Sequence, residues 1–357
     1  MGFKKAKSWL SIINDNDKRV LSCFGPPLKG DNNMEKVVEN STAFLARRYP
    51  PLVEEKIKNR YRVRCNNSDS RLSVSQLTEQ ARGCEVLFVS VTESLPRSVF
   101  DALSDTLRVV ATLSVGVDHI DLGAAKEYGV KVLHSPDVLS DACAEVGMML
   151  MLNAARRGHE ADRMVRSGRW TGWGPTQLLG KELTGKKLGI LGMGRIGQAF
   201  AERARAFKMV IHYHNRHRLD PSLECGAIYH ETVDSLLVKS EFFSINAPGS
   251  DSLKGFLNQE KIQLLPKGAV VINISRGDVV DDDALIQALK NGHLFSAGLD
   301  VFKGEPDIDP RYAELENIYL SPHIGSATTE TRNAMGFMLI DGLDELKSGQ
   351  RPTNCII

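Results

Sequence analysis

The chain has 357 residues, more than one ordinary hydrophobic core accommodates, and its length predicts two domains. Hydrophobic residues make up 42%, charged residues 25%, and the formal net charge is +1, so nothing in the composition points to nucleic acid as a partner. No apolar run approaches the roughly 18 residues of a membrane span, and no secretory signal opens the chain, which predicts a cytoplasmic protein without membrane contacts.

The cysteines are scattered, with no CxxC pair and no histidine at zinc-ligand spacing. This pattern predicts reduced thiols and no metal site. The residues are Cys23, Cys65, Cys84, Cys143, Cys225 and Cys355.

The first part of the chain divides at Ser41. Residues 1–40 carry charge, Asn and the breaker stretch Gly25-Pro26-Pro27 without a sustained period, which predicts an N-terminal extension to which we assign no function. After Ser41, short apolar strands alternate with helical segments, a rhythm that predicts a parallel α/β sheet. Strands are expected at 41–46, 61–65, 86–91, 107–117 and 130–136, and helices at 51–60, 73–83 and 121–128.

A second α/β run follows a long apolar helix. Residues 140–158 place apolar side chains around most of a helix, as expected of one packed between two domains. An irregular segment follows, and strands and helices then alternate from Lys187 to His323. The last helical stretch, 328–346, is placed to return to the first domain. We therefore predict an α/β fold in which 41–137 and 326–357 form one domain and 138–325 form the other.

A glycine-rich turn is the most specific local motif. Gly192-Met193-Gly194-Arg195-Ile196-Gly197 directly follows an apolar strand and opens a helical pattern. In that context the first glycine permits a tight turn, the second lets backbone approach a pyrophosphate, and the third lets helix and strand touch. Free amides at the helix start attract the anion. The motif predicts a dinucleotide site, with a glycine turn of an unrelated α/β protein as the alternative.

The next strand, 209–214, bears on which dinucleotide binds. An NAD-binding chain usually ends this strand with Asp or Glu, whereas this one continues with Asn215, Arg216, His217 and Arg218. A neutral amide followed by guanidinium groups can pair with a ribose 2′-phosphate, so we predict that NADP (NADPH) is preferred and that NAD remains possible. The alternative is that both arginines are solvated loop charges.

Polar residues follow three apolar segments of the second domain. We expect strands at 270–277, 298–302 and 320–325, with Arg276, Glu305 and His323 at or beyond their ends. In a parallel sheet the carboxyl ends of strands gather at the crevice where a dinucleotide lies, so these side chains can converge. Reduction of a keto acid needs a cation for the substrate, an acid for the new alkoxide and a group that orients the acid.

The order of these motifs carries a family resemblance over roughly residues 41–350. GMGRIG, VINISRGDVVDDDAL, GLDVFKGEP and SPHIGSAT resemble the signatures of the D-isomer-specific 2-hydroxyacid dehydrogenase family. SVGVDHIDL, SPDVLSDACAE and TRNAMGFM are most similar to its glyoxylate and hydroxypyruvate reductase branch. The resemblance implies two Rossmann-like domains across a cleft, with the substrate domain built from both chain ends.

The resemblance also implies roles for the strand-end residues. His323 would donate the proton during reduction, Glu305 would be its hydrogen-bonded partner, and Arg276 would bind and polarise the substrate. A carboxylate against imidazole favours the charged imidazolium, and a guanidinium can hold a 2-keto acid through two oxygens. Each residue alone could equally be structural or a surface ion pair.

Further site residues follow from the same likeness. The backbone at Val91, Val115 and Gly116 would help hold the substrate carboxylate, since glycine allows close approach of a ligand. Asn246 begins a turn that would line the cofactor cleft, and Asp300 would sit near the nicotinamide carboxamide. The other positions matched to cofactor binding are Ala247, Pro248, Ile274 and Gly325.

Two departures from the family pattern stand out. Ser250, Ser252 and Leu253 replace the usual Thr, Glu and Thr, which puts the hydrogen bonds of that turn, and with them cofactor affinity, in doubt. Lys303 adds a positive charge before Glu305, and we expect it to point to solvent.

Alternatives remain inside and outside the family. The chain ends soon after His323, which disfavours phosphoglycerate dehydrogenases with a regulatory domain, and Ser321-Pro322 disfavours formate oxidation. Phosphite oxidation, a family enzyme using NADH, or a corepressor-like dinucleotide sensor remain open. A homodimer is expected, in which Trp170 and Trp173 either close the neighbouring active site or pack in the interface.

Overall fold

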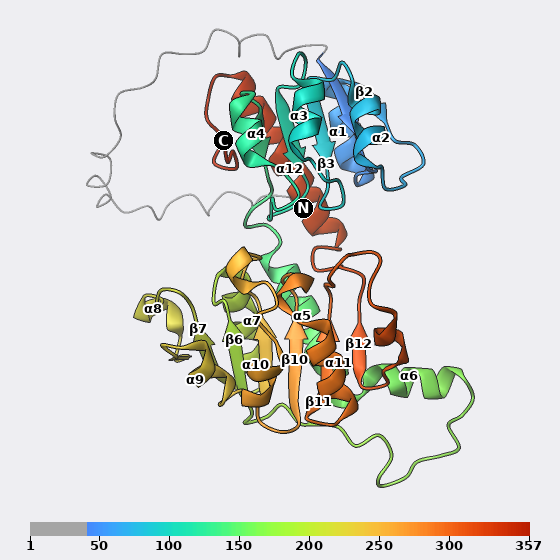
Figure 1. The fold of residues 1–357 in the computed structure, drawn as a ribbon, viewed down its shortest axis with the longest axis vertical. Helices are drawn as coiled ribbons and strands as arrows, with labels where there is room; N and C mark the ends of the chain where they lie inside the picture. Colours follow the sequence, from blue (N-terminus) through green and yellow to red (C-terminus); the bar gives the residue numbers. More distant parts are fainter. Residues whose placement is uncertain (1–40) are drawn as a thin grey trace, which may run out of the picture.

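The computed structural model describes residues 41–357 and builds them into two α/β units, each on one parallel sheet (Figure 1). This confirms the predicted fold class. The predicted N-terminal extension, residues 1–40, lies outside the described residues. Within residues 41–357, no helix combines the length and apolar character that crossing a membrane requires.

The first unit is a five-stranded sheet with the order β2-β1-β3-β4-β5. Every pair in it is parallel, and the central strands β3 and β4 are buried along their whole length. Its strands are β1 (Thr42–Leu45), β2 (Arg62–Cys65), β3 (Val86–Val89), β4 (Val109–Thr112) and β5 (Lys131–Leu133), and its first helices are α1 (Pro51–Arg60), α2 (Val74–Ala81), α3 (Arg97–Leu103) and α4 (Leu122–Glu127).

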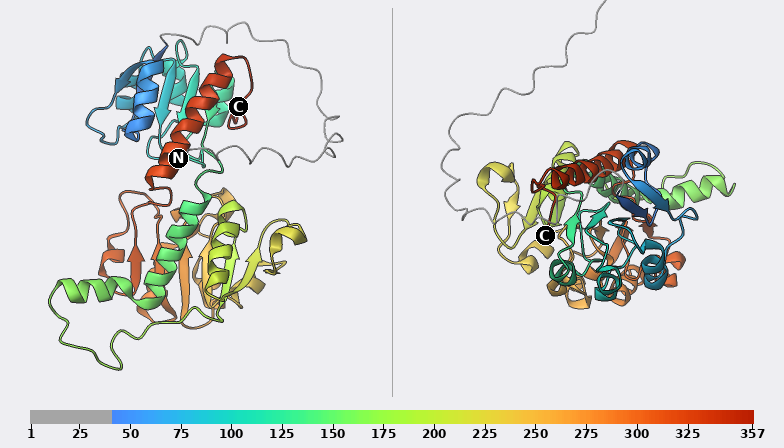
Figure 2. Two further views of the ribbon diagram at one scale, coloured as in Figure 1. Left: turned by 180° about the vertical axis from the view of Figure 1, so that it is seen from behind. Right: turned by 90° about the horizontal axis from the view of Figure 1, so that it is seen from above.

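The C-terminal helix α12 (Thr329–Lys347) completes this unit. Leu339, Ile340 and Leu343 join a buried cluster that also contains residues of β1, α1 and β3. Gly336 lies so close to α1 that a Cβ there would stand 2.5 Å from a methyl group of Val53. Figure 2 shows α12 running across the back of the sheet, so both ends of the described chain build one unit, as predicted.

The second unit is a seven-stranded parallel sheet with the order β12-β11-β10-β9-β6-β7-β8. The chain starts in the middle at β6, runs outward through β7 and β8, and then returns to β9 on the other side of β6. Its strands are β6 (Lys187–Leu191), β7 (Val210–His214), β8 (Ile228–Tyr229), β9 (Phe242–Ile245), β10 (Ala269–Asn273), β11 (Leu294–Leu299) and β12 (Ile318–Leu320). The strand order reverses between β6 and β9, and doubly wound sheets bind ligands in the crevice that forms beyond the carboxyl ends of the strands at such a reversal.

Helices cover both faces of this sheet. The helix α7 (Arg195–Ala206) follows β6, and the others between strands are α8 (Pro221–Glu224), α9 (Val233–Leu237), α10 (Gln259–Leu264) and α11 (Asp282–Lys290). Three short 3₁₀ turns are η1 (Asp251–Leu253), η2 (Gly277–Val279) and η3 (Pro310–Glu314).

The helix α5 (Ser140–Arg156) connects the units, and its buried Leu150 and Met151 pack into the core of the second sheet (Figure 1). Two expectations for this region were wrong. The helix ends at Arg156 instead of 158 because Arg157 adopts a left-handed backbone with φ 53°. The segment after it is not irregular throughout, since it begins with the amphipathic helix α6 (Gly158–Arg166).

The strand ends also differ from expectation. We expected 270–277, 298–302 and 320–325 to be strands, but β10, β11 and β12 end at Asn273, Leu299 and Leu320. The first-domain strands likewise stop early, at Thr112 for β4 and Leu133 for β5. A hydrophobic pattern does not by itself show where the sheet pairing of a strand stops.

The buried His212 of β7 makes the stability of this sheet depend on pH. Its Nδ1 lies 2.9 Å from Nε2 of His230, and burial, with smaller contributions from nearby His230, Lys187 and Lys239, lowers the pKa of His212 to about 4. An unfolded histidine titrates near a pKa of about 6.5. Between these values the unfolded chain binds the extra proton, so the free energy of unfolding falls as pH falls from about 6.5 to about 4.

Replacing His212 with Phe should therefore flatten that dependence. Chemical denaturation at pH 7 and pH 5 should show a smaller loss of stability in H212F than in the wild-type chain. The exposed His217→Phe provides the matched control and should keep the wild-type slope. Equal slopes in all three proteins would mean that His212 titrates normally in the folded state.

Candidate active site

The glycine turn between β6 and α7 has the geometry that a bound phosphate requires. Gly192 has φ +96°, and a Cβ there would lie 2.4 Å from the backbone nitrogen of Ala247. A Cβ on Gly197 would lie 2.3 Å from the carbonyl oxygen of Gly192, whereas one on Gly194 would meet nothing within 4 Å. Gly192 and Gly197 have no room for a side chain because backbone atoms lie against them, whereas Gly194 faces open space that a ligand can approach.

The start of α7 offers backbone amides to that space. Gly194 is its N-cap residue and supplies no side-chain acceptor, so the helix start can attract an anion. The side chain of Asn215 accepts a hydrogen bond of 2.6 Å from Met193 N–H and so fixes the turn. Arg195 pairs with Asp137 at 2.5 Å, and Ile196 packs against a small apolar cluster between the units.

Asn246, at the end of β9, faces the same crevice. Its Oδ1 accepts from the Ser244 hydroxyl at 2.7 Å, but its Nδ2 is buried and has no hydrogen-bond partner within the described chain. Ala247 lies directly behind it, against Gly192, and Pro248 follows. A buried amide donor without a partner costs free energy, so a polar ligand atom bound here would satisfy it. The crevice therefore fits a dinucleotide.

The two arginines beyond β7 differ in what they contact. Arg218 donates two hydrogen bonds to Glu224, at 2.7 and 3.0 Å, and lies over the ring of Tyr229. The bonds from Arg218 and Tyr213 lower the pKa of Glu224 to about 2, so this carboxylate stays charged. Arg216 is exposed and has no hydrogen bond or ion pair with any residue in 41–357. Of these two arginines, Arg216 is the one whose guanidinium has no partner among residues 41–357.

Glu305 and His323 meet beyond the ends of neighbouring strands β11 and β12. His323 Nδ1 lies 2.7 Å from Glu305 Oε2, and Glu305 Oε1 accepts a 2.7 Å bond from Phe302 N–H. Burial raises the pKa of Glu305, but the bonds from His323 and Phe302 and the charge of Arg276 outweigh it and lower the pKa below its usual value. The carboxylate is thus held ionised against the imidazole.

Arg276 follows β10 and reaches from the second unit to the first. Its Nε donates to Asp118 at 2.8 Å, and its Nη1 donates to the carbonyl oxygen of Ser275 at 2.9 Å. The adjoining Gly277 sits against the backbone of Phe302, where a Cβ would lie 1.8 Å from its carbonyl carbon. The segments that carry Arg276 and Glu305 are therefore side by side.

The predicted substrate contacts lie on loops after β3 and β4. Val91 is 39% exposed and Val115 is 37% exposed, as surface positions open to a ligand would be. The carbonyl of Val115 accepts from His134 Nδ1 at 2.9 Å, which fixes this loop. Gly116 is in direct contact with the guanidinium of Arg276. The structure thus brings Gly116 to the site and places Val91 on the loop after β3, the strand that pairs with β4.

Asp300 has a structural contact that sequence reasoning missed. Its side chain is 1% exposed, and its carboxylate accepts from Ser321 Oγ at 2.6 Å and from the N–H groups of Ile324 and Gly325 at 2.8 and 2.9 Å. Burial raises the pKa of Asp300 despite these bonds. Asp300 thus clamps the segment that presents His323. The only sequence signal was a single acid after a buried strand.

The structure also shows the contacts or the exposure of other residues that the sequence singled out. Ile274 packs into the core beside Gly147, and a Cβ on Gly325 would lie 3.0 Å from the sulfur of Cys143. Lys303 is exposed, as expected. Ser250 and Ser252 bond to each other through their hydroxyls at 3.0 Å, so the turn keeps a local hydrogen bond.

The remaining reactive groups are the side chains that could bind a metal ion and the cysteine thiols. Within residues 41–357 no group of three or more His, Cys, Asp or Glu could hold a metal ion. The cysteines of that part of the chain are all free thiols.

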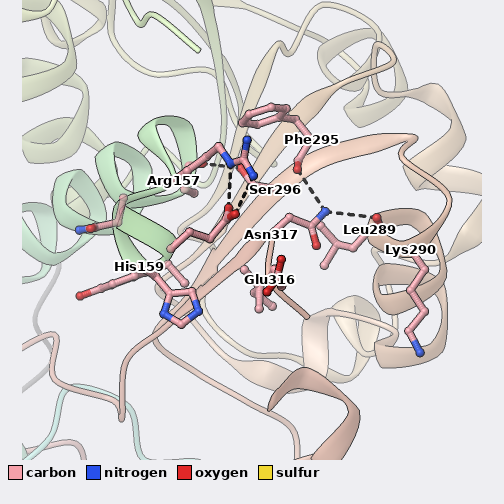
Figure 3. A pocket seen from close by; sticks show the side chains of 13 residues that line it. Arg157, His159, Leu289, Lys290, Phe295, Ser296, Glu316 and Asn317 are labelled. Carbon is pink, nitrogen blue, oxygen red and sulfur yellow. Dashed lines mark hydrogen bonds and ion pairs between the residues drawn. The ribbon is translucent and has the colours of Figure 1, made fainter. Parts of the chain in front are cut away.

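The best-defined cavity, of about 380 Å³, lies away from this site (Figure 3). It borders the beginnings of β11 and β12, the opposite edge of the sheet from His323. Several of its polar groups already bond to protein partners: Arg157 pairs with Glu160, and the Asn317 amide donates to the carbonyls of Leu289 and Phe295. We therefore place the functional site at the strand ends, where the ionisable groups and the open glycine turn lie.

Comparison with known proteins gives consistent matches over most of the chain. Residues 148–325 match the family described as "D-isomer specific 2-hydroxyacid dehydrogenase, NAD binding domain". The chain is 40% identical to the glycerate dehydrogenase of Hyphomicrobium methylovorum, over 84% of this chain and 94% of that protein.

Two solved structures show the same likeness. A putative D-isomer specific 2-hydroxyacid dehydrogenase from Polaromonas has a TM-score of 0.86 and 59% identity, covering 89% of this chain and all of that one. The NADPH-dependent glyoxylate/hydroxypyruvate reductase of Sinorhizobium meliloti, in complex with NADP and malonate, has a TM-score of 0.80 and 31% identity, covering 89% and 97%.

Asp300 provides a test of how the His323 segment is held. Asp300→Asn replaces one acceptor oxygen with an amide group that faces N–H donors, and we expect it to lower the free energy of unfolding by about 1–3 kcal/mol. Ser321→Ala removes only one donor and should cost less. Denaturant unfolding of both variants measures this, and a D300N protein as stable as wild type would show that the clamp is dispensable.

Proposed function

Because the chain belongs to the D-isomer specific 2-hydroxyacid dehydrogenase family, we propose that it reduces a small 2-keto acid, glyoxylate or hydroxypyruvate, to the D-2-hydroxy acid with NADPH. The observation that carries the proposal is the 2.7 Å pair of His323 and Glu305, with Arg276 on the adjoining segment. The names of similar proteins, glycerate dehydrogenase and glyoxylate/hydroxypyruvate reductase, support this substrate class.

His323 acts as the proton donor in this proposal. NADPH, when bound, supplies a hydride to the keto carbon, and the oxygen then needs a proton. Glu305, held ionised, accepts a hydrogen bond from Nδ1 of His323, which fixes the orientation of the ring and leaves Nε2 to donate the proton. Asp300 keeps this imidazole in place through the backbone of residues 321–325.

Arg276 binds and polarises the substrate. Its guanidinium stays charged at any working pH and can bind a carboxylate and the neighbouring carbonyl oxygen together. A cation beside the carbonyl stabilises the negative charge that develops there during reduction. The backbone of Val91, Val115 and Gly116 completes the cradle for the substrate carboxylate.

The dinucleotide would be held by the crevice between β6 and β9. Gly192, Gly194 and Gly197 with the start of α7 receive the pyrophosphate, and Asn246, Ala247 and Pro248 line the opposite side. Other positions assigned to cofactor binding are Arg195, Ile196, Asn215, Arg216, Ile274, Asp300 and Gly325. We accordingly assign 138–325 as the dinucleotide-binding domain and 41–137 with 326–357 as the substrate domain.

We further propose a homodimer and a cytoplasmic location. Trp170 is 54% exposed and Trp173 is 84% exposed, on the segment that projects beyond α6 in Figure 2. Aromatic side chains of this size are enriched at protein interfaces, so a second copy is the partner that would bury them.

The proposal is tested by steady-state kinetics over a short panel: glyoxylate, hydroxypyruvate, pyruvate and phenylpyruvate, each with NADPH and with NADH. We expect the highest kcat/KM for one of the first two with NADPH. A preference for NADH, or for the larger acids, would point to another enzyme of the family. No activity with any pair would favour the dinucleotide-sensing alternative.

His323→Asn should lower kcat by about 10²- to 10⁴-fold, because the proton donor acts in the transition state. NADPH binding, followed by quenching of protein fluorescence, should be unchanged. If the variant turns over at the wild-type rate, the proton comes from elsewhere.

Arg216→Ala should raise KM for NADPH about 10-fold or more and leave KM for NADH nearly unchanged, since only NADPH carries the 2′-phosphate. Arg218→Ala is the matched comparison, because Glu224 already occupies that guanidinium, and its effect should be smaller. An equal loss with both cofactors would argue against a phosphate contact at Arg216.

A further inference from the structure

Asp118 has no role in the proposed reaction so far, yet it contacts the substrate-binding arginine directly. It lies on the loop after β4, in the substrate domain, and its carboxylate accepts the Nε–H of Arg276 at 2.8 Å. The two residues are 158 positions apart in sequence and lie on loops of different α/β units. Their ion pair therefore exists only when the loop after β4 lies against the end of β10.

The rest of the Arg276 side chain is confined by glycines from both units. A Cβ on Gly116 would lie 1.9 Å from Nη2, and a Cβ on Gly249 would lie 2.8 Å from Cγ. Nη1 also donates to the carbonyl of Ser275 at 2.9 Å. A larger residue at Gly116 would displace the guanidinium, so Gly116 leaves the room that this position of Arg276 needs, and the Arg276 side chain is 33% exposed.

The hydrogen bonds of Arg276 use some of the N–H donors of its guanidinium and leave the others free. A guanidinium carries five N–H donors. Asp118 takes the one on Nε and Ser275 takes one on Nη1. The remaining donors are all on the terminal nitrogens, and a carboxylate or keto acid can engage two of them through two oxygens.

We propose that Asp118 is a positioning residue for Arg276: by holding Nε–H, its carboxylate sets the guanidinium plane so that the terminal nitrogens face the substrate. The inference rests on the proposed function of Arg276. It also makes the orientation of the substrate-binding cation depend on the substrate domain, because the acceptor comes from that side. A misplacement of about 1 Å at such a group can cost 10²-fold in rate.

The test compares Asp118→Ala and Asp118→Asn with wild type, using the full chain with NADPH and its best 2-keto acid. D118A should lower kcat/KM for the keto acid about 10- to 100-fold while KM for NADPH stays the same. D118N keeps an acceptor oxygen at the same place and should recover most of the loss. Asp101→Ala, an exposed acid of the same unit that contacts Tyr128, is the matched control and should behave as wild type.

A double-mutant cycle shows whether Asp118 acts through Arg276. In an Arg276→Lys background no guanidinium is left to orient, so adding D118A should change kcat/KM less than 2-fold, a non-additive result. If turnover of R276K is too low, binding of oxamate to the enzyme–NADPH complex, followed by NADPH fluorescence, gives the same cycle. An equal cost of D118A in both backgrounds, or no cost in wild type, overturns the inference.

The failure of this inference is distinct from failure of the proposed function. A wild-type chain that reduces no keto acid of the panel contradicts both. An active wild type whose D118A variant keeps full kcat/KM contradicts only the role of Asp118.

Discussion

The site depends on the parallel pairing of β10, β11 and β12, which end at the same edge of the second sheet. Because side-by-side parallel strands finish together, the segments that follow them must share the space above that edge. Arg276, Glu305 and His323 each stand in such a segment, and none is on a strand itself. The reactive side chains therefore lie on loops, and the pairing of the strands determines which of these loops lie next to one another.

A buried carboxylate then fixes one of these loops. Asp300 directly follows β11, and its carboxylate accepts hydrogen bonds from the backbone N–H groups of the two residues after His323, Ile324 and Gly325. A carboxylate is buried at a cost unless it is fully hydrogen-bonded, and here the bonds that offset this cost also hold the imidazole toward Glu305. Structural stability and the geometry of the proposed proton donor therefore depend on the same contacts.

Local sequence patterns were enough to predict the main architecture. Apolar strands alternating with helical segments gave both sheets, the strand before and helix after GMGRIG identified the turn, and the apolar character of 140–158 identified α5. The helix α6 was missed because it is only nine residues long and most of its side chains are polar, so few apolar residues mark it in the sequence.

The contacts of particular side chains were harder to predict. That Arg218 is occupied by Glu224 while Arg216 is free depends on how the chain turns after β7, and both arginines look alike in sequence. Asp300 and Asp118 contact segments 24 and 158 positions away, and no spacing rule connects such partners. The motifs that contain Asp300 and Asp118 can be recognised in the sequence, but the residues that these two side chains contact are seen only once the loops at the strand ends are packed.

If these loops hold a 2-keto acid between bound NADPH and His323, the keto carbon receives a hydride on one face and the carbonyl oxygen receives a proton. The most direct measurement is the handedness and stoichiometry of the product when the enzyme is given hydroxypyruvate and a limiting amount of NADPH. The account predicts one D-glycerate for each NADPH oxidised. L-glycerate, a mixture of the two forms, or NADPH oxidation without glycerate would contradict it.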